Sequence, residues 1–179
     1  MRTLMSVLVT ILAVTAIHAA ENAAASPASA IAVVQATEGN KATGTVRFTQ
    51  TGDKVRVVAD FENLSPGKHG FHIHEFGDTS AKDGASAGGH FNPGGAPHAG
   101  HDAAHRHAGD LGNVDAGADG KAHLDVTIDG FSVSGANAIL GRSVVIHEKT
   151  DDLATQPSGN SGPRIGVGVI GVAKSADAK

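Results

Sequence analysis

Histidine is concentrated in the middle of this 179-residue chain, and its imidazole nitrogens are common metal ligands. The sequence contains eleven histidines, and eight of them lie between His69 and His107. It contains no cysteine, which excludes disulfide bonds and thiolate ligands. Any metal ion bound here must therefore be held by histidine nitrogens and carboxylate oxygens.

The pair His72 and His74 lies in a β-type run at residues 69–76. Side chains alternate along a strand, so both rings point to the same face and can share one metal ion. Taken alone, a pair with this spacing is more often two surface histidines on a half-exposed strand. Spacing alone leaves both interpretations open.

A second group of candidate ligands lies in a stretch rich in glycine, alanine and histidine. Its members are His90, His98, His107 and Asp110. Three imidazoles and one carboxylate suit the closed tetrahedral site that zinc prefers. The same stretch contains His101 and His105, which need no role, so a solvated histidine-rich loop is the alternative interpretation.

Two further residues lie at the ends of apolar runs. His147 follows the run 143–146 and could complete a copper site with His72 and His74. Arg164 opens the last apolar run, directly after the glycine-rich turn at 159–163. Taken singly, each is also consistent with an ordinary surface residue. Spacing alone predicts a metal-binding β-protein and nothing more specific.

The elements that must position these residues are short strands. Runs of β-type residues occur at 30–36, 44–50, 54–61, 69–76, 143–147 and 164–173, and Val126 and Ile128 indicate another. Many short strands separated by turn residues favour a sandwich or a barrel. Residues 78–121 show little periodicity and are predicted to form one long loop. Such a loop is uncommon in a small domain unless it carries function.

Composition limits the remaining possibilities. The chain has six Phe and no Tyr or Trp, so aliphatic residues and Phe must form the core of a single domain. The net charge is −4 without a basic cluster, which argues against nucleic-acid binding.

Residues 1–20 are predicted to be a secretory signal peptide, because Arg2 precedes an uncharged apolar stretch that ends in small residues. That stretch is short for a membrane span, so we expect no stable membrane insertion of the mature chain; a retained N-terminal anchor is the alternative. Residues 21–30 are predicted to be a flexible lead-in, followed by one domain at 31–179.

Five motifs resemble signatures of the Cu/Zn superoxide dismutase family and occur in that family's order. They are 70–78 (GFHIHEFGD), 89–93 (GHFNP), 107–113 (HAGDLGN), 141–152 (GRSVVIHEKTDD) and 159–164 (GNSGPR). The resemblance extends from about residue 31 to residue 173, nearly the whole of the expected mature chain. The chain is therefore similar to this family over its full domain.

The resemblance implies two metal ions, copper and zinc, that share one ligand. It implies copper ligands His72, His74, His90 and His147, and zinc ligands His90, His98, His107 and Asp110. His90 would bridge both ions as an imidazolate. Asp151 matches a carboxylate that hydrogen-bonds ligands of both metals. Arg164 matches the arginine that guides the anion beside copper, so His90 and Arg164 are the expected catalytic residues, and His69 resembles a histidine that is not a ligand.

The resemblance also implies the fold and the activity. Family members fold as an eight-stranded Greek-key barrel, a flattened β-sandwich for which these enzymes are themselves a standard example. The implied activity is dismutation of superoxide to oxygen and hydrogen peroxide by a copper redox cycle, with zinc supporting the bridging ring. We expect a homodimer that uses segments 139–141 and 168–172, and an exported protein that is periplasmic or extracellular. A non-catalytic copper or zinc buffer or carrier, and an envelope interaction module with an incidental histidine-rich loop, are the competing functions.

The sequence departs from the family in two places. Most members have a disulfide between the loop after the His-x-His strand and the last strand, and by alignment Gly84 and Val167 occupy those positions here. Residues 153–158 form a short, uncharged loop where other members have a longer, charged one. Because the chain is net negative, steering of an anionic substrate is expected to depend on Arg164, with Lys149 as a second candidate.

Overall fold

Short segments of β-type residues form eight strands in the computed structural model, which describes residues 28–174. The strands are β1 (Ser29–Ala36), β2 (Thr43–Thr51), β3 (Lys54–Glu62), β4 (Gly67–His74), β5 (Asp110–Ala116), β6 (Ala122–Ile128), β7 (Ser143–His147) and β8 (Arg164–Val172). A single turn of 3-10 helix, η1 (Ala85–Ala87), follows β4. The predicted signal peptide at 1–20 lies outside the described residues, as does most of the lead-in. Strand β1 begins at Ser29, so the last two residues of the predicted lead-in belong to the barrel.

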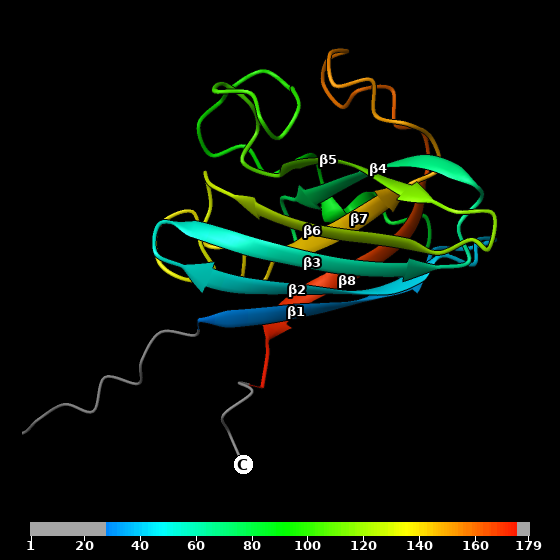
Figure 1. Cartoon of the computed structure of the whole chain (residues 1–179), viewed down its shortest axis with the longest axis horizontal. Coiled ribbons are helices and arrows are strands. Elements are labelled where there is room, and N and C mark those ends of the chain that lie inside the picture. The colour runs from blue at the N-terminus through cyan, green and yellow to red at the C-terminus, as the bar shows by residue number, and fades with distance from the viewer. Residues whose placement is uncertain (1–27, 175–179) are drawn as a thin grey trace, which may run out of the picture.

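The strands close into an antiparallel barrel in the order β1-β2-β3-β6-β5-β4-β7-β8 (Figure 1). Three consecutive strands, β4 to β6, are neighbours, and the strand that follows them, β7, returns to pair with β4. This arrangement is a Greek key. It confirms the predicted all-β, eight-stranded Greek-key barrel. Among residues 28–174 there is no helix with the length and apolar character of a membrane span.

The prediction of one continuous loop at 78–121 was wrong, because strand β5 lies inside it. Strand β5 begins with the buried carboxylate of Asp110, and its Gly112 has a positive φ of 84°. The register with β4 also shifts between Gly70 and His72. A buried acid and a local bulge remove the simple alternation by which a strand is recognised in a sequence.

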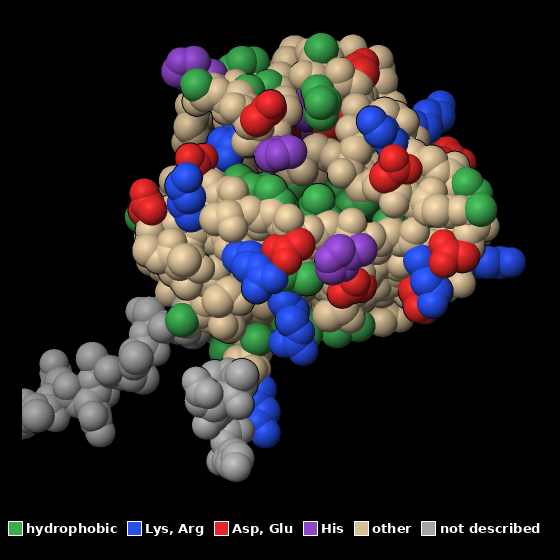
Figure 2. Space-filling view, in the orientation of Figure 1, with side chains coloured by type: hydrophobic (Ala, Val, Ile, Leu, Met, Phe, Trp, Pro, Cys, Tyr) green, Lys and Arg blue, Asp and Glu red, His purple; other side chains and the backbone are tan. Residues whose placement is uncertain are grey.

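The barrel interior is filled by aliphatic side chains and phenylalanines. Phe48 packs edge-to-face against Phe131 with ring centroids 6.5 Å apart, and Phe61 packs against Phe71 at 5.2 Å. On the outer face of β3 and β6, charged side chains form cross-strand pairs such as Arg56–Asp125. Figure 2 shows acidic and basic side chains interspersed on this side of the molecule, without a block of one sign.

Strands β4 and β7 differ from the others because both of their faces are buried. Phe71 and Ile73 of β4 point into the barrel core, so the alternating residues His72 and His74 point to the opposite face. Val144 and Ile146 of β7 likewise enter the core, which leaves Val145 and His147 on that same outer face. Loops before β5 and before β8 project from this side of the barrel (Figure 1). The candidate site lies between this pair of strands and these loops.

Candidate metal centre

Two groups of potential metal ligands occur among the described residues, and they share His90. The groups are His72, His74, His90 and His147, and His90, His98, His107 and Asp110. Within each group, one donor atom from every residue lies within 4.8 Å of the others. The structure therefore brings together every member of the two predicted ligand sets. Their role as ligands stays a prediction.

The first group is held by paired strands. His74 on β4 and His147 at the end of β7 approach each other through their Nε2 atoms, which are 3.4 Å apart. The opposite ring nitrogens contact backbone carbonyls: Nδ1 of His74 lies 2.9 Å from the oxygen of Gly88, and Nδ1 of His147 lies 3.0 Å from that of Gly162. A carbonyl oxygen can only accept a hydrogen bond, so each Nδ1 carries the hydrogen and both Nε2 lone pairs are free for a cation.

His72 and His90 complete this group with their other nitrogens. His72 Nε2 lies 2.8 Å from a carboxylate oxygen of Asp151, which leaves its Nδ1 facing the group. Both His72 Nδ1 and His90 Nε2 are buried and have no hydrogen-bond partner among the described residues. Unpaired buried polar atoms are rare and costly. Four imidazole rings whose free nitrogens face one another are a donor set that fits a copper ion.

The second group surrounds the carboxylate of Asp110, which is fully buried. Its Oδ1 lies 2.8 Å from Nδ1 of His90, 3.0 Å from Nδ1 of His98 and 3.2 Å from Nδ1 of His107. Its Oδ2 accepts backbone N–H groups of Ala99 and His107, each at 3.1 Å. One oxygen and three imidazole nitrogens around one point are the donors of a closed zinc site. This donor set also fits its predicted ion.

Asp151 joins the two groups. Its carboxylate oxygens lie 2.8 Å from Nε2 of His72 and 2.8 Å from Nε2 of His98. Asn113 holds Asp151 in place, because its side chain accepts the N–H of Asp151 at 2.8 Å and donates to its carbonyl at 2.9 Å. One carboxylate therefore orients one candidate ligand of each metal.

The environment sets the charge of each group. Burial lowers the pKa of His72 to about 4 and that of His147 to about 3, and it also lowers the pKa of His74. Burial acts in the same direction on His98, but the carboxylates of Asp110 and Asp151 outweigh it and raise the pKa of His98 to about 9. His72, His74 and His147 are therefore neutral at pH 7, and each keeps a lone pair free for a cation.

Backbone hydrogen bonds connect the loop to strand β4. The N–H of Ile73 donates to Gly109, the N–H of Phe91 donates to Ile73, and the N–H of Gly109 donates to Phe91, at 2.8–2.9 Å. A side chain at Gly109 would collide with the carbonyl of Ile73, so only glycine fits there. This three-way contact places the neighbouring residues His74, His90 and Asp110 around one centre.

Arg164 lies beside the first group and also anchors the loop that carries His90. It pairs with His147 in the β7–β8 ladder, and its guanidinium donates to the carbonyls of Gly84 and Gly88. Val167, at the other position of the missing disulfide, packs with Ala87 and Val145 in a small apolar cluster. These contacts connect the loop to β8 without a covalent bond.

The remaining histidines named in the sequence have other environments. His69 is buried between carbonyls, 2.8 Å from that of His147 and 2.9 Å from that of Ser65. His101 and His105 are exposed and belong to neither group. A pocket of about 400 Å³ opens onto His74, His90, His147 and Arg164, with Pro157 and Ser158 in its wall.

Comparison with known proteins gives one consistent result. A family model described as "Copper/zinc superoxide dismutase (SODC)" matches residues 42–170. The extracellular superoxide dismutase [Cu-Zn] of Brugia pahangi is 40% identical over 154 residues, which cover 81% of this chain and 76% of that protein. The protein of the same name from Caenorhabditis elegans is 46% identical over 134 residues, or 72% of this chain and 60% of that protein.

A solved structure agrees with the fold. The crystal structure of the clock protein EA4 superposes with a TM-score of 0.75 at 41% sequence identity. The match covers 82% of this chain and 96% of the EA4 chain.

Without metal, we predict that the free energy of unfolding is largest near pH 6.5 and falls on both sides. On the acid side, His72 and His147 bind protons more readily in the unfolded chain, so stability falls as the pH drops from about 6.5 to 4. On the alkaline side, folded His98 keeps a proton that the unfolded chain releases, so stability falls between about pH 6.5 and 9. Urea unfolding of chelator-treated protein, followed by far-UV circular dichroism, measures this profile. Constant stability from pH 6.5 to 4 would contradict it.

Proposed function

We propose that this chain, which belongs to the copper/zinc superoxide dismutase family, converts superoxide to oxygen and hydrogen peroxide. The observation that carries the proposal is the position of His90. Its Nε2 is unpaired and buried beside three histidines, while its Nδ1 lies 2.8 Å from Asp110. One ring is thus placed to contact two different cations.

The protein side of the reaction is the handling of one proton at His90. When bound, copper would supply a one-electron redox change, and zinc would supply a fixed positive charge. His90 Nε2 takes up one proton from water once the first superoxide has lost an electron and left as oxygen. His90 then donates this proton to the second superoxide, which gains one electron and a further proton from water and leaves as hydrogen peroxide.

The other candidate ligands must stay in place while His90 exchanges its proton. His72, His74 and His147 meet this need because they extend from paired strands whose opposite faces are packed in the core. Their outward-facing nitrogens are fixed by carbonyls and by Asp151. A redox centre with such rigid ligands changes little in geometry during the cycle.

Arg164 is proposed to attract and orient superoxide. It is the one lysine or arginine among the described residues that line the pocket at His74 and His147. The nearby wall residues Pro157 and Ser158 are uncharged, and the chain is net negative. Superoxide dismutases are a standard example of electrostatic steering, which concentrates an anion through local positive potential.

A copper or zinc buffer or carrier on the same fold is the second candidate function. Such a protein would use the same ligands but would not need a cation beside the pocket. The position of Arg164 therefore favours the enzyme. An interaction module with an incidental histidine-rich loop would leave the unpaired atoms His72 Nδ1 and His90 Nε2 without explanation.

We also propose that the chain is exported, to the periplasm or to the extracellular space. Two relatives carry the word extracellular in their names. The predicted signal peptide at 1–20 agrees with this location.

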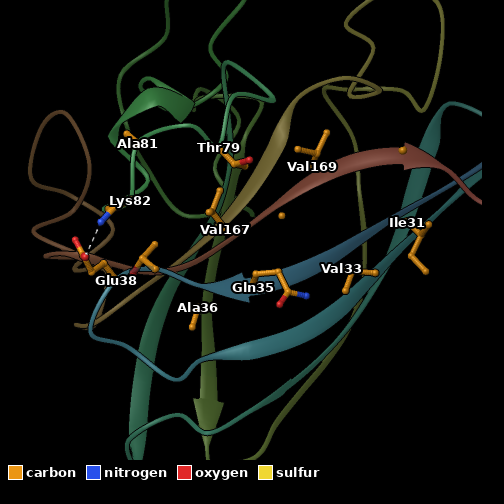
Figure 3. Close-up of a pocket in the computed structure, with 13 residues that line it drawn as sticks. Ile31, Val33, Gln35, Ala36, Glu38, Thr79, Ala81, Lys82, Val167 and Val169 are labelled. Atoms are coloured by element: carbon orange, nitrogen blue, oxygen red, sulfur yellow. Dashed lines mark hydrogen bonds and ion pairs between the residues drawn. The ribbon is translucent and has the colours of Figure 1, made fainter.

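A homodimer is proposed on the outer face of β1 and β8. Val33 and Val169 are 56% and 43% exposed there, which is unusual for valines on paired strands. A groove of about 650 Å³ runs along this face (Figure 3), with the ion pair of Lys82 and Glu38 at one end. This surface includes the predicted dimer segment 168–172, and a second copy would cover its apolar side chains.

Loaded with copper and zinc, the native protein is predicted to accelerate superoxide decay, and His147→Ala to lose activity by more than about 100-fold. Removing a residue that hydrogen-bonds a metal ligand typically lowers metal affinity or activity by roughly 10–100-fold, and removing a ligand itself lowers them further. Pulse-radiolysis decay rates, normalised to measured metal content, test this prediction. His101→Ala removes an exposed histidine of the same loop and is expected to keep native activity. Full activity in His147→Ala, or no activity in a fully loaded native protein, would refute the proposal.

Replacing Arg164 by alanine is predicted to lower the rate by about tenfold at low ionic strength and to weaken its dependence on salt. Arg164→Lys keeps the charge and should retain most of this dependence. Arg47→Ala, on the exposed side of β2, is the matched control. Identical salt profiles for native protein and Arg164→Ala would show that Arg164 does not steer the substrate.

Light scattering at micromolar concentration is predicted to give the mass of a dimer for the native chain and of a monomer for Val169→Glu. A buried carboxylate in an apolar interface is strongly unfavourable. Thr127→Glu places the same charge on the exposed side of β6 and should leave the dimer intact. A native monomer under these conditions would exclude this interface.

A further inference from the structure

We infer that Gln156 is a positioning residue that fixes the backbone of His98, a predicted zinc ligand. The inference rests on the zinc site proposed above. The N–H of His98 donates to Oε1 of Gln156 at 2.8 Å, and Nε2 of Gln156 donates to the carbonyl of His98 at 2.9 Å. A single side chain thus satisfies both backbone groups of His98, as a neighbouring strand would.

His98 needs such support because no regular element holds it. The segment 92–109 contains no strand or helix, whereas His72, His74 and His147 lie on paired strands and Asp110 begins β5. The ring of His98 is nevertheless buried, with Nε2 at Asp151 and Nδ1 3.0 Å from Asp110. A small rotation of the backbone at this position would move Nδ1 away from the other donors. Metal sites depend strongly on the partners that orient their ligands.

The loop that carries Gln156 is organised by its own hydrogen bonds. The carboxylate of Asp152 accepts the N–H groups of Ala154 and Thr155 at 3.0 and 2.8 Å, and the hydroxyl of Thr155 at 2.6 Å. Asn160 donates to the same carboxylate at 3.1 Å. These hydrogen bonds lower the pKa of Asp152 to about 2, and the bond from the Thr155 hydroxyl has the largest effect. None of these contacts involves a candidate ligand, so the loop can present Gln156 before any metal binds.

The same loop also backs the ring of His98. The N–H of Gly159 donates to the carbonyl of Thr155 at 2.7 Å, and its φ is +65°. A side chain at Gly159 would collide with the carboxylate of Asp151 and the ring of His98. The loop therefore holds His98 at two places, with Gln156 on the backbone and Asp151 with Gly159 at the ring.

This arrangement connects the zinc ligand to the substrate pocket. Pro157 and Ser158 follow Gln156 directly and line the pocket beside His74, His147 and Arg164. Gln156 lies 58 positions after His98 in the chain and thus connects this predicted zinc ligand to the wall of the copper-side pocket. The chain contains no cysteine, so no disulfide holds these loops together, and the contact between Gln156 and His98 is one of the noncovalent links between them.

The test is the affinity of copper-free protein for Zn²⁺, measured by competition with a chromophoric chelator. Gln156→Met keeps the length of the side chain but removes both hydrogen bonds to His98, together with the one to the carbonyl of Ala154 at 3.1 Å. We expect zinc affinity to fall by about 10–100-fold. Gln50→Met is the matched control. Gln50 also accepts a backbone N–H, that of Val133 at 2.8 Å, and donates to a carbonyl, that of Gly52 at 2.9 Å, but it lies on β2 away from the ligands. Its zinc affinity should equal that of the native protein.

Hydrogen exchange of the His98 amide supplies a second readout that does not depend on metal. We expect this amide to be protected in the native metal-free protein and to lose protection in Gln156→Met. Should Gln156→Met fail to fold, Gln156→Glu keeps the acceptor for the His98 N–H and removes the donor to the His98 carbonyl. The His98 amide should then stay protected, while zinc affinity is again expected to fall.

Two results distinguish failure of the proposed zinc site from failure of the proposed role of Gln156. A native protein that binds no zinc would refute the metal assignment itself. Native-like zinc affinity in Gln156→Met, beside a native protein that does bind zinc, would overturn the role of Gln156 alone.

Discussion

The ring of His90 carries the constraint on which the rest of the site depends, because both of its nitrogens are buried and only one of them has a partner. Its side chain is 3% exposed, with Nδ1 at the Asp110 carboxylate and Nε2 unpaired beside three other histidines. When Nδ1 donates to Asp110, Nε2 presents a lone pair to three ring nitrogens whose own lone pairs are also free, and no donor among the described residues satisfies it. Two cations on opposite sides of the ring satisfy both nitrogens at once.

The surrounding structure serves to hold the other ring nitrogens in the correct orientation. Each candidate copper ligand outside the bridge has its second nitrogen occupied, by the carbonyl of Gly88, the carbonyl of Gly162 or the carboxylate of Asp151. The strands supply position, and these contacts supply orientation. The candidate zinc ligand His98 is oriented in the same way by Asp151 at its ring and by Gln156 at its backbone, and both residues come from the loop before β8. The barrel therefore acts as a rigid support, and two loops complete the site on its outer face.

The sequence predicted this fold well where alternation and turn residues were clear. Six strands were evident from runs of β-type residues, some alternating as in β3, and Val126 and Ile128 indicated β6 as well. The ligand candidates were evident from their residue types. Strand β5 was not predicted, because a buried aspartate and a bulge interrupt the alternation of apolar and polar residues. The roles of Asn113 and Gln156 also escaped, since a side chain bonded to a distant backbone leaves no periodic signal. Without the disulfide, the sequence could not tell how the loop is anchored, whereas the structure shows Arg164 on two carbonyls and a small apolar cluster around Val167.

The most direct test of the account is a crystal structure of the protein loaded with copper and zinc, with anomalous diffraction recorded at the absorption edge of each metal. The account predicts two separate ions, copper at Nε2 of His90 and zinc at Nδ1 of the same ring. A single ion, or two ions of which only one contacts His90, would contradict it.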